Sequence, residues 1–224
     1  MDMNKNKHLP FKGLNLPAEE AIKRSAEFFE LMRQRRSVRF FSDRAVPRQI
    51  IDNIIKTAGS APSGAHKQPW SFCVVSNKQL KSKIRDLAEK EEKINYESRM
   101  SERWKEDLEF LGTDNIKEFI EIAPYLIIVF RKPYDFDEKG NKTQNYYVNE
   151  SVGIASGFLI TAIHNAGLVT LTHTPSPMGF LEEVLNRPKN EKAYLLLPVG
   201  YPAENATVPN LTRKKINEIA FYYE

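Results

Sequence analysis

The sequence has 224 residues, of which 41% are hydrophobic and 28% are charged, as is usual for a soluble globular protein. Its 33 basic and 29 acidic residues alternate along the chain and leave a net charge of +4, which argues against a nucleic-acid-binding face. The apolar runs are far shorter than the roughly 20 residues of a membrane-spanning helix, and the N-terminus has no apolar core of a secretory signal. The single cysteine, Cys73, excludes an internal disulfide, and no metal-ligand spacing is evident. We therefore expect a cytoplasmic protein without metal, membrane or nucleic-acid partners.

The first third of the chain predicts two helices and a strand after a polar arm. The arm is expected at residues 1–16, and one domain at residues 17–224. Apolar spacing predicts a helix from Pro17 to Gln34. A second helix should begin after Pro47 and end at Gly59. The short aromatic and β-branched run WSFCVVS then predicts a strand.

A long charged stretch follows, from Asn77 to about Leu111. Asn77 is a suitable N-cap, but the apolar stripe of this helical segment is thin. Thin burial favours mobility, so the part at about residues 88–112 is a candidate lid. Lys117 lies beyond it, in DNIKEFIEIA, which again has helical spacing.

Strands and one strongly apolar helix alternate in the second half. The apolar run PYLIIVFR predicts a buried strand, and YDFDEKGNKTQN a polar loop. NESVGIASGFLITAIHNAG predicts a helix that Gly167 ends, VTLTHTP a short strand, and KAYLLLPVGYP the last strand. Because helices and strands interleave at irregular spacings, the fold class is α+β.

Arginines gather in RQRRSVRFF, residues 33–41. The planar donors of arginine match phosphate oxygens, and Arg35 and Arg39 would project the same way from a helical turn. The alternative is a solvated helix end whose cations complement the helix dipole.

The loop APSGAHKQPW, residues 61–70, is the second candidate binding segment. Ser63 can donate its hydroxyl, and Gly64 lets a ligand approach the backbone. An ordinary turn is the alternative, with His66 as a surface or capping histidine.

Together these segments resemble the iodotyrosine deiodinases, a branch of the FMN-dependent nitroreductase superfamily. The resemblance covers about residues 30–216 in unchanged order and is carried by RRSVRFF, TAGSAPSGAHKQPW, EEKINYESRM, RWKEDL, NIKEFIEIAPYLIIVF, NAGLVTLTHTP, EKAYLLLPVGYP and ATVPNLTRKK. It implies a nitroreductase-like fold, in which a mainly antiparallel central sheet is flanked by helices and two subunits form an intertwined homodimer. Membrane-tethered members of the family carry an N-terminal hydrophobic anchor, which we do not expect here.

The resemblance also implies an FMN site at the subunit interface. The residues that would hold the phosphate, the ribityl chain and the ring edge are Arg35, Arg36, Ser37, Val38, Arg39 and Arg213. Ser63 and Gly64 would border the flavin from the partner subunit, and Thr172, His173 and Thr174 would line it. The Thr174 hydroxyl would lie near flavin N5, which makes Thr174 the predicted catalytic residue.

The substrate half of the predicted site is suited to an amino acid. Glu92 and Tyr96 are four residues apart and share a helical face, and Lys117 follows on the next predicted helix. Glu92 would bind an ammonium group and Lys117 a carboxylate, while the resemblance adds the backbone N–H of Ala65 as a contact for the substrate's phenolate oxygen. Taken alone, Glu92 in the charged run EKEEK favours a solvated helix face, and only the resemblance reverses this interpretation.

The reaction that the resemblance implies is FMN-dependent reductive dehalogenation of 3-iodotyrosine and related halotyrosines to tyrosine and halide. Electrons would pass stepwise from reduced FMN and come ultimately from NAD(P)H, either directly or through a partner reductase. The alternatives are a general NAD(P)H nitroreductase or quinone reductase on the same fold, a non-catalytic flavin-binding module, and a small basic adaptor.

Overall fold

The computed structural model describes residues 8–224, so residues 1–7 of the expected arm lie outside the described residues. Contacts divide the chain into two compact units, Met1–Arg35 and Arg36–Glu224. Helix α1 (Ala18–Arg33) follows Pro17 and confirms the first predicted helix. None of its residues is buried.

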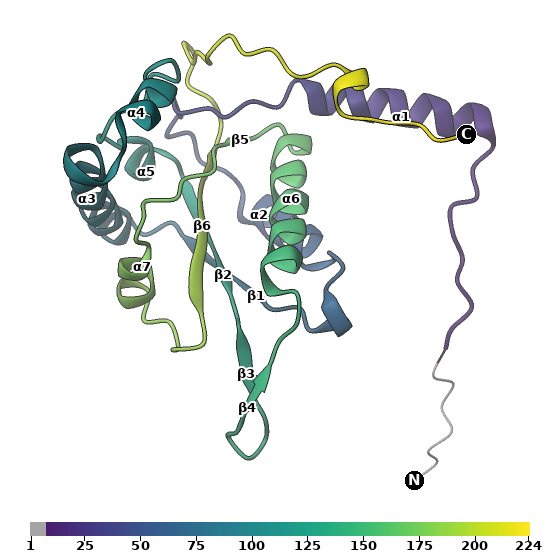
Figure 1. Ribbon diagram of the computed structural model, residues 1–224, viewed down its shortest axis with the longest axis horizontal. Helices are drawn as coiled ribbons and strands as arrows, with labels where there is room; N and C mark the ends of the chain where they lie inside the picture. Colours follow the sequence, from purple (N-terminus) through teal and green to yellow (C-terminus); the bar gives the residue numbers. More distant parts are fainter. Residues whose placement is uncertain (1–7) are drawn as a thin grey trace. The chain divides into compact units, whose positions relative to one another are not determined.

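The second unit is built on a four-stranded antiparallel sheet with strand order β1-β2-β6-β5 (Figure 1). The strands are β1 (Trp70–Val75), β2 (Tyr125–Arg131), β5 (Val169–Thr170) and β6 (Lys192–Gly200). Strand β2 pairs on both sides, with Ile127 opposite Val74 of β1 and Leu197 of β6. Because its five central residues are buried, both faces of the sheet must be covered.

Helices cover the two faces. Successive side chains of a strand point to opposite faces, and β2 divides accordingly. Ile127 and Val129 pack with the layer formed by α2 (Arg48–Gly59) and α6 (Val148–Asn165). Ile128 and Phe130 pack with the layer formed by α3 (Lys78–Ile94), α5 (Phe119–Ile122) and α7 (Gly179–Val184). This arrangement, visible in Figure 1, confirms the predicted α+β fold with an antiparallel sheet flanked by helices.

The segment predicted as a lid divides into a packed part and an exposed part. Helix α3 starts at the N-cap Asn77, whose side chain accepts from Leu80 N–H at 2.9 Å. The helix stays packed as far as the fully buried Ala88 and beyond, and it runs into a π-helical turn, η2 (Asn95–Arg99). The following α4 (Glu102–Glu109) has no buried residue.

Three local predictions are wrong. The expected polar loop is a hairpin of β3 (Tyr134–Phe136) and β4 (Lys142–Gln144), whose turn is organised by the Asp137 carboxylate. Lys117 precedes α5 and does not lie on a helix, because α5 is a single turn. The arginine segment is also not helical, since α1 ends at Arg33 and Ser37 forms a parallel bridge with Thr170.

Two short 3-10 turns complete the described chain, η1 (Gly64–His66) in the predicted binding loop and η3 (Ile216–Glu218) near the C-terminus. The predicted strand at residues 169–175 pairs as β5 and again at His173, which bridges to Leu196. In the described part of the chain, no helix is both long and apolar enough to cross a membrane.

Candidate active site

A cavity of about 480 Å³ lies between the α3–η2–α4 segment and the chain that follows β5. Seven of the predicted site residues line it, namely Arg39, Glu92, Tyr96, Lys117, Thr172, His173 and Thr174. The other residues of its wall include Asn95, Arg99, Met100, Trp104, Leu108 and Phe119. Apolar and aromatic walls with a few charged groups are typical of a site for a small aromatic ligand.

The charges of the cavity centre on a buried ion pair. Lys117 Nζ lies 3.7 Å from Glu92 Oε2, and the two side chains are only 4% and 10% exposed. Burial raises the pKa of Glu92 although Lys117 opposes this effect, and burial lowers the pKa of Lys117 although Glu92 opposes it. Desolvation therefore outweighs the attraction between Glu92 and Lys117. A ligand with a positive charge near Glu92 and a negative charge near Lys117 would stabilise the charged forms of both.

Tyr96 and Arg39 stand beside this pair. The Tyr96 hydroxyl donates to Thr113 O at 3.1 Å, and its ring lies 5.8 Å from Lys117 Nζ. Burial raises the pKa of Tyr96, so the phenol is a neutral donor near neutral pH. Arg39 adds a half-buried cation to the cavity wall, and burial lowers its pKa.

The THTP segment contributes two exposed hydroxyls and one buried ring. His173 exchanges backbone hydrogen bonds with Leu196, so the flanking Thr172 and Thr174 point the other way from its ring. The His173 ring packs edge-on to Phe119 with 5.5 Å between centroids, and its Nε2 has no hydrogen-bond partner among the described residues. Burial lowers the pKa of His173 to about 3, with smaller contributions from Lys117 and Arg39.

The remaining arginines and Ser37 belong to an extended segment. Val38 is buried and its N–H donates to Thr170 O at 3.2 Å, which fixes the segment beside β5. The Arg36 guanidinium donates to Pro209 O, so residue 36 is tied to the chain near Arg213. Arg35 lies in the other unit, where its N–H donates to Met32 O.

The loop at residues 63–66 packs on the start of α6 and does not line this cavity in the single chain. Gly64 N–H donates to Ser151 Oγ at 3.2 Å, and Ser63 Oγ accepts from Gln68 N–H. Ala65 has a φ of 47°, a left-handed backbone that is uncommon for a residue with a side chain. Such a conformation is held in place by its surroundings and is frequent at ligand sites.

Several residues of the cavity wall are additional to the predicted set. Asn95 and Arg99 face the loop after Thr174, where Asn95 Nδ2 donates to Ser176 O at 2.8 Å. Trp104 belongs to the thin apolar stripe of the predicted lid, and this stripe was the one sequence signal for it. Nothing in the sequence identified Asn95 as a residue of the cavity wall, because a single amide within a charged helix belongs to no recognisable motif or spacing.

Known proteins resemble the chain along most of its length. Residues 32–201 match the model of the nitroreductase family, the class of protein that the fold and cavity define. An iodotyrosine deiodinase of Haliscomenobacter hydrossis is 60% identical over 206 residues, covering 92% of this chain and 93% of that protein. The iodotyrosine deiodinase 1 of Homo sapiens is 51% identical over 213 residues, covering 95% of this chain and 74% of that protein.

Solved structures agree with this grouping. A crystal structure of oxidized iodotyrosine deiodinase bound to FMN and 3-iodo-L-tyrosine superposes with a TM-score of 0.77 at 32% identity, covering 88% of this chain and 99% of that one. An FMN-bound nitroreductase from Bacteroides fragilis, with a TM-score of 0.67 at 20% identity, shares the fold. The chain therefore belongs to the nitroreductase family and, within it, to the iodotyrosine deiodinases.

Proposed function

We propose that this protein is an FMN-dependent enzyme that reductively removes the halogen of a halogenated tyrosine such as 3-iodotyrosine. The observation that carries the proposal is the Glu92–Lys117 pair on the wall of the cavity. A carboxylate and an ammonium that are both poorly solvated fit the two charges of an amino-acid zwitterion. A general nitroreductase or quinone reductase would have no use for such a pair.

The residues of the chain fit FMN. Arg36, Arg39 and Arg213 can supply cations for its phosphate, because guanidinium groups bind phosphate oxygens through paired donors. Ser37 and Val38 lie in the same extended segment, and Thr172 and Thr174 expose hydroxyls at the cavity.

FMN would supply the two electrons of the reaction, and NAD(P)H would be their ultimate source, directly or through a partner reductase. One carbon–halogen bond breaks and one carbon–hydrogen bond forms, so a halotyrosine, two electrons and a proton give tyrosine and a halide ion. In this proposal Glu92 binds the substrate ammonium, Lys117 its carboxylate, and Tyr96 adds a phenol donor. Thr174 is the catalytic hydroxyl at the flavin.

The proposal also includes a homodimer. Ser63, Gly64 and Ala65 belong to the expected site but lie away from the cavity of their own chain, so a second copy would have to supply them. Ile154 and Phe158 on α6 are exposed apolar side chains that a second subunit would cover. Ala65 N–H would then contact the phenolate oxygen of the substrate.

The experiment is release of iodide from 3-iodotyrosine by the FMN-loaded protein with dithionite as reductant. Iodide release with loss of the 3-iodotyrosine supports the proposal, and a flavin-loaded protein that releases none contradicts it. Glu92→Gln should bind 3-iodotyrosine weakly, and normal binding by this variant would favour the general nitroreductase. Thr174→Ala should keep FMN bound but lose dehalogenation, and unchanged activity would refute the role of Thr174.

A further inference from the structure

Lys117 occupies a stretch of chain that has little regular structure of its own. It lies between α4 and α5, and α5 is a single turn. Its side chain is nevertheless held closely, since Nζ donates to Thr113 Oγ1 at 3.3 Å and to Asp114 O. These bonds are local, so they cannot fix the segment relative to α3, which carries Glu92.

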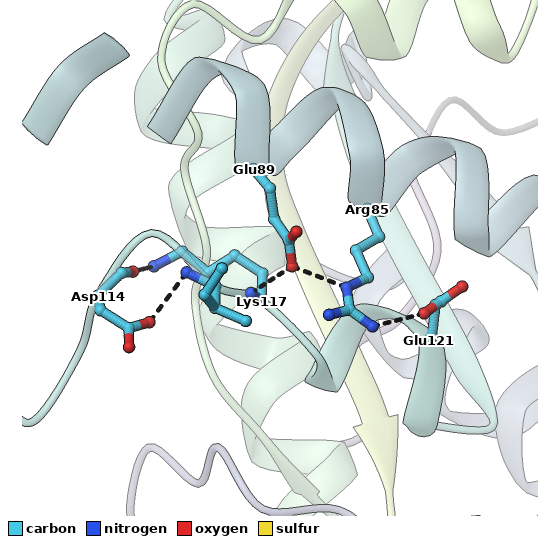
Figure 2. Close-up of polar contacts among 6 residues, drawn as sticks. Arg85, Glu89, Asp114, Lys117 and Glu121 are labelled. Atoms are coloured by element: carbon cyan, nitrogen blue, oxygen red, sulfur yellow. Dashed lines mark hydrogen bonds and ion pairs between the residues drawn. The ribbon is translucent and has the colours of Figure 1, made fainter. Parts of the chain in front are cut away.

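A charged face of α3 makes the missing connection (Figure 2). Glu89 Oε1 accepts the backbone N–H of Lys117 at 2.7 Å and the Arg85 Nε–H at 2.7 Å. Arg85 also donates to Glu121 Oε2 at 2.6 Å, near the end of α5. The Arg85 and Glu89 side chains therefore hold both ends of the Lys117–Glu121 segment.

One more turn back along α3, Lys81 completes this face. The spacing of Lys81, Arg85 and Glu89 is four residues, so the three side chains point the same way. Lys81 is buried, and its Nζ donates to Glu121 O and to Ala123 O, each at 2.6 Å. The α3 helix thus binds the segment through charged side chains at successive turns.

Glu89 and Glu92 differ in what they hold. Glu92 is one turn further along α3 and faces the ammonium of Lys117 inside the cavity, whereas Glu89 accepts the backbone N–H of the same residue. A carboxylate that accepts a backbone N–H forms a charge-assisted bond, which is stronger than a neutral one. Arg85 orients this carboxylate, and the Arg85 and Glu89 side chains are only 24% and 21% exposed.

We propose that Glu89 is the positioning residue that sets the Lys117 ammonium opposite Glu92, and that Arg85 orients Glu89 for this task. The proposal rests on the proposed function, because it assigns to Glu89 the geometry of the amino-acid end of that substrate. Glu89 does not line the cavity and touches no substrate. Its loss should therefore weaken the binding of ligands that carry the zwitterion and spare ligands that lack it.

The test compares 3-iodotyrosine with 2-iodophenol, which has the halogenated ring but no amino-acid group. Dissociation constants are measured by titration of the FMN-loaded protein. Glu89→Ala should raise the dissociation constant of 3-iodotyrosine about tenfold and leave that of 2-iodophenol unchanged. Glu89→Gln should show a smaller rise, because its amide oxygen can still accept the Lys117 N–H. Equal weakening of both ligands, or of neither, would overturn the proposal.

The matched control is Asp52→Asn in α2. Asp52 pairs with Arg48 at the same i,i+4 spacing and the same 2.7 Å distance, but the pair is exposed and neither residue lines the cavity. This variant should bind both ligands as the wild type does. A shift like that of Glu89→Ala would mean that any such ion pair has this effect.

Hydrogen exchange at the Lys117 amide gives a readout that does not depend on the substrate. The N–H that Glu89 accepts should exchange faster in Glu89→Ala, with the amides of β2 unchanged. If wild-type protein fails to prefer 3-iodotyrosine, the proposed function fails, and this exchange rate still decides whether Glu89 positions Lys117. Unchanged exchange would refute that role.

Discussion

Asn95 Nδ2 donates a hydrogen bond of 2.8 Å to Ser176 O and so links the turn after α3 to the loop that follows Thr174. The amide is buried, and Arg99 reinforces the contact by donating to Asn95 Oδ1 and to Ser176 O. The wall of the cavity formed by the turn after α3 is thereby tied to the wall that carries Thr174, the proposed catalytic residue.

The first prediction concerns this link. Asn95→Ala should raise the dissociation constant of 3-iodotyrosine about fivefold, because loss of a buried neutral hydrogen bond costs ~1 kcal/mol. Amides of η2 and α4 should exchange faster with solvent. The control is Ser98→Ala, since Ser98 Oγ donates to Ile94 O within the same turn, whereas the hydrogen bonds to Ser176 O come from Asn95 and Arg99. Equal effects of the two substitutions would show that the link to Ser176 is unimportant.

The second prediction concerns the pH dependence of substrate binding. Burial raises the pKa of Glu92, so its carboxylate takes up a proton at a higher pH than usual and the ammonium of the substrate loses its partner. Burial lowers the pKa of Lys117, so its cation is lost at a lower pH than usual. Affinity for 3-iodotyrosine should therefore fall as the pH drops through the raised pKa of Glu92, and also as it rises through the lowered pKa of Lys117.

Measuring the affinity of Glu92→Gln as a function of pH separates the decline at low pH from the decline at high pH. This variant should bind weakly at every pH, and its affinity should lack the decline on the acid side. The measurement is the dissociation constant of 3-iodotyrosine from pH 5 to pH 9, a window of about two units around neutral. If the loss of affinity at low pH persists in Glu92→Gln, it is caused by the protonation of another group.

Sequence alone predicted the parts of the fold that local patterns specify. The apolar run of β2 and the apolar residues of α6 were enough to predict these two elements. Asn77 was predicted as an N-cap because its side-chain oxygen can accept a backbone N–H of the first helical turn. The β3–β4 hairpin was missed because each strand has only three residues, none of them buried, so no buried face imposes a recognisable pattern. Periodicity identifies an element only where one face is buried.

The site shows the same limit. Glu92 and Tyr96 could be paired from their spacing, but the position of Lys117 is set by Glu89, which is 28 residues earlier in the chain. Arg35 and Arg39 would project the same way only from a helical turn, whereas long-range pairing holds this segment extended beside Thr170. Contacts between distant residues decide both cases, and a single sequence does not record them.

The third prediction concerns the close approach of the binding loop to α6. A Cβ on Gly64 would meet Tyr147 Cδ2 at 2.9 Å and the backbone oxygen Tyr146 O at 3.0 Å. Gly64→Ala should therefore displace the loop, lower the free energy of unfolding by about 1–3 kcal/mol and weaken FMN binding. Both are measurable, by urea unfolding and by flavin titration.

Gly59→Ala is the control for Gly64→Ala. Gly59 closes α2, and a Cβ there would meet nothing within 4 Å. Its substitution should leave FMN binding unchanged and keep or slightly raise stability, since alanine favours helix by about 1 kcal/mol over glycine. Normal flavin affinity in Gly64→Ala would refute the importance of this approach.

The last prediction concerns acid stability and His173. Its folded-state pKa of about 3 lies below the ordinary value of 6.5, so the folded protein keeps the ring neutral while the unfolded chain binds a proton. The contribution of this group to stability is therefore complete above pH 6.5 and is lost progressively as the pH falls from 6.5 towards 3. His173→Phe removes the titration and the unpartnered Nε2, and it retains an aromatic ring to pack on Phe119. Urea unfolding of both proteins at several pH values between 7 and 4 should show the variant gaining on the wild type at each step downward. A constant difference across that range would mean that the ring does not stay neutral in the folded protein.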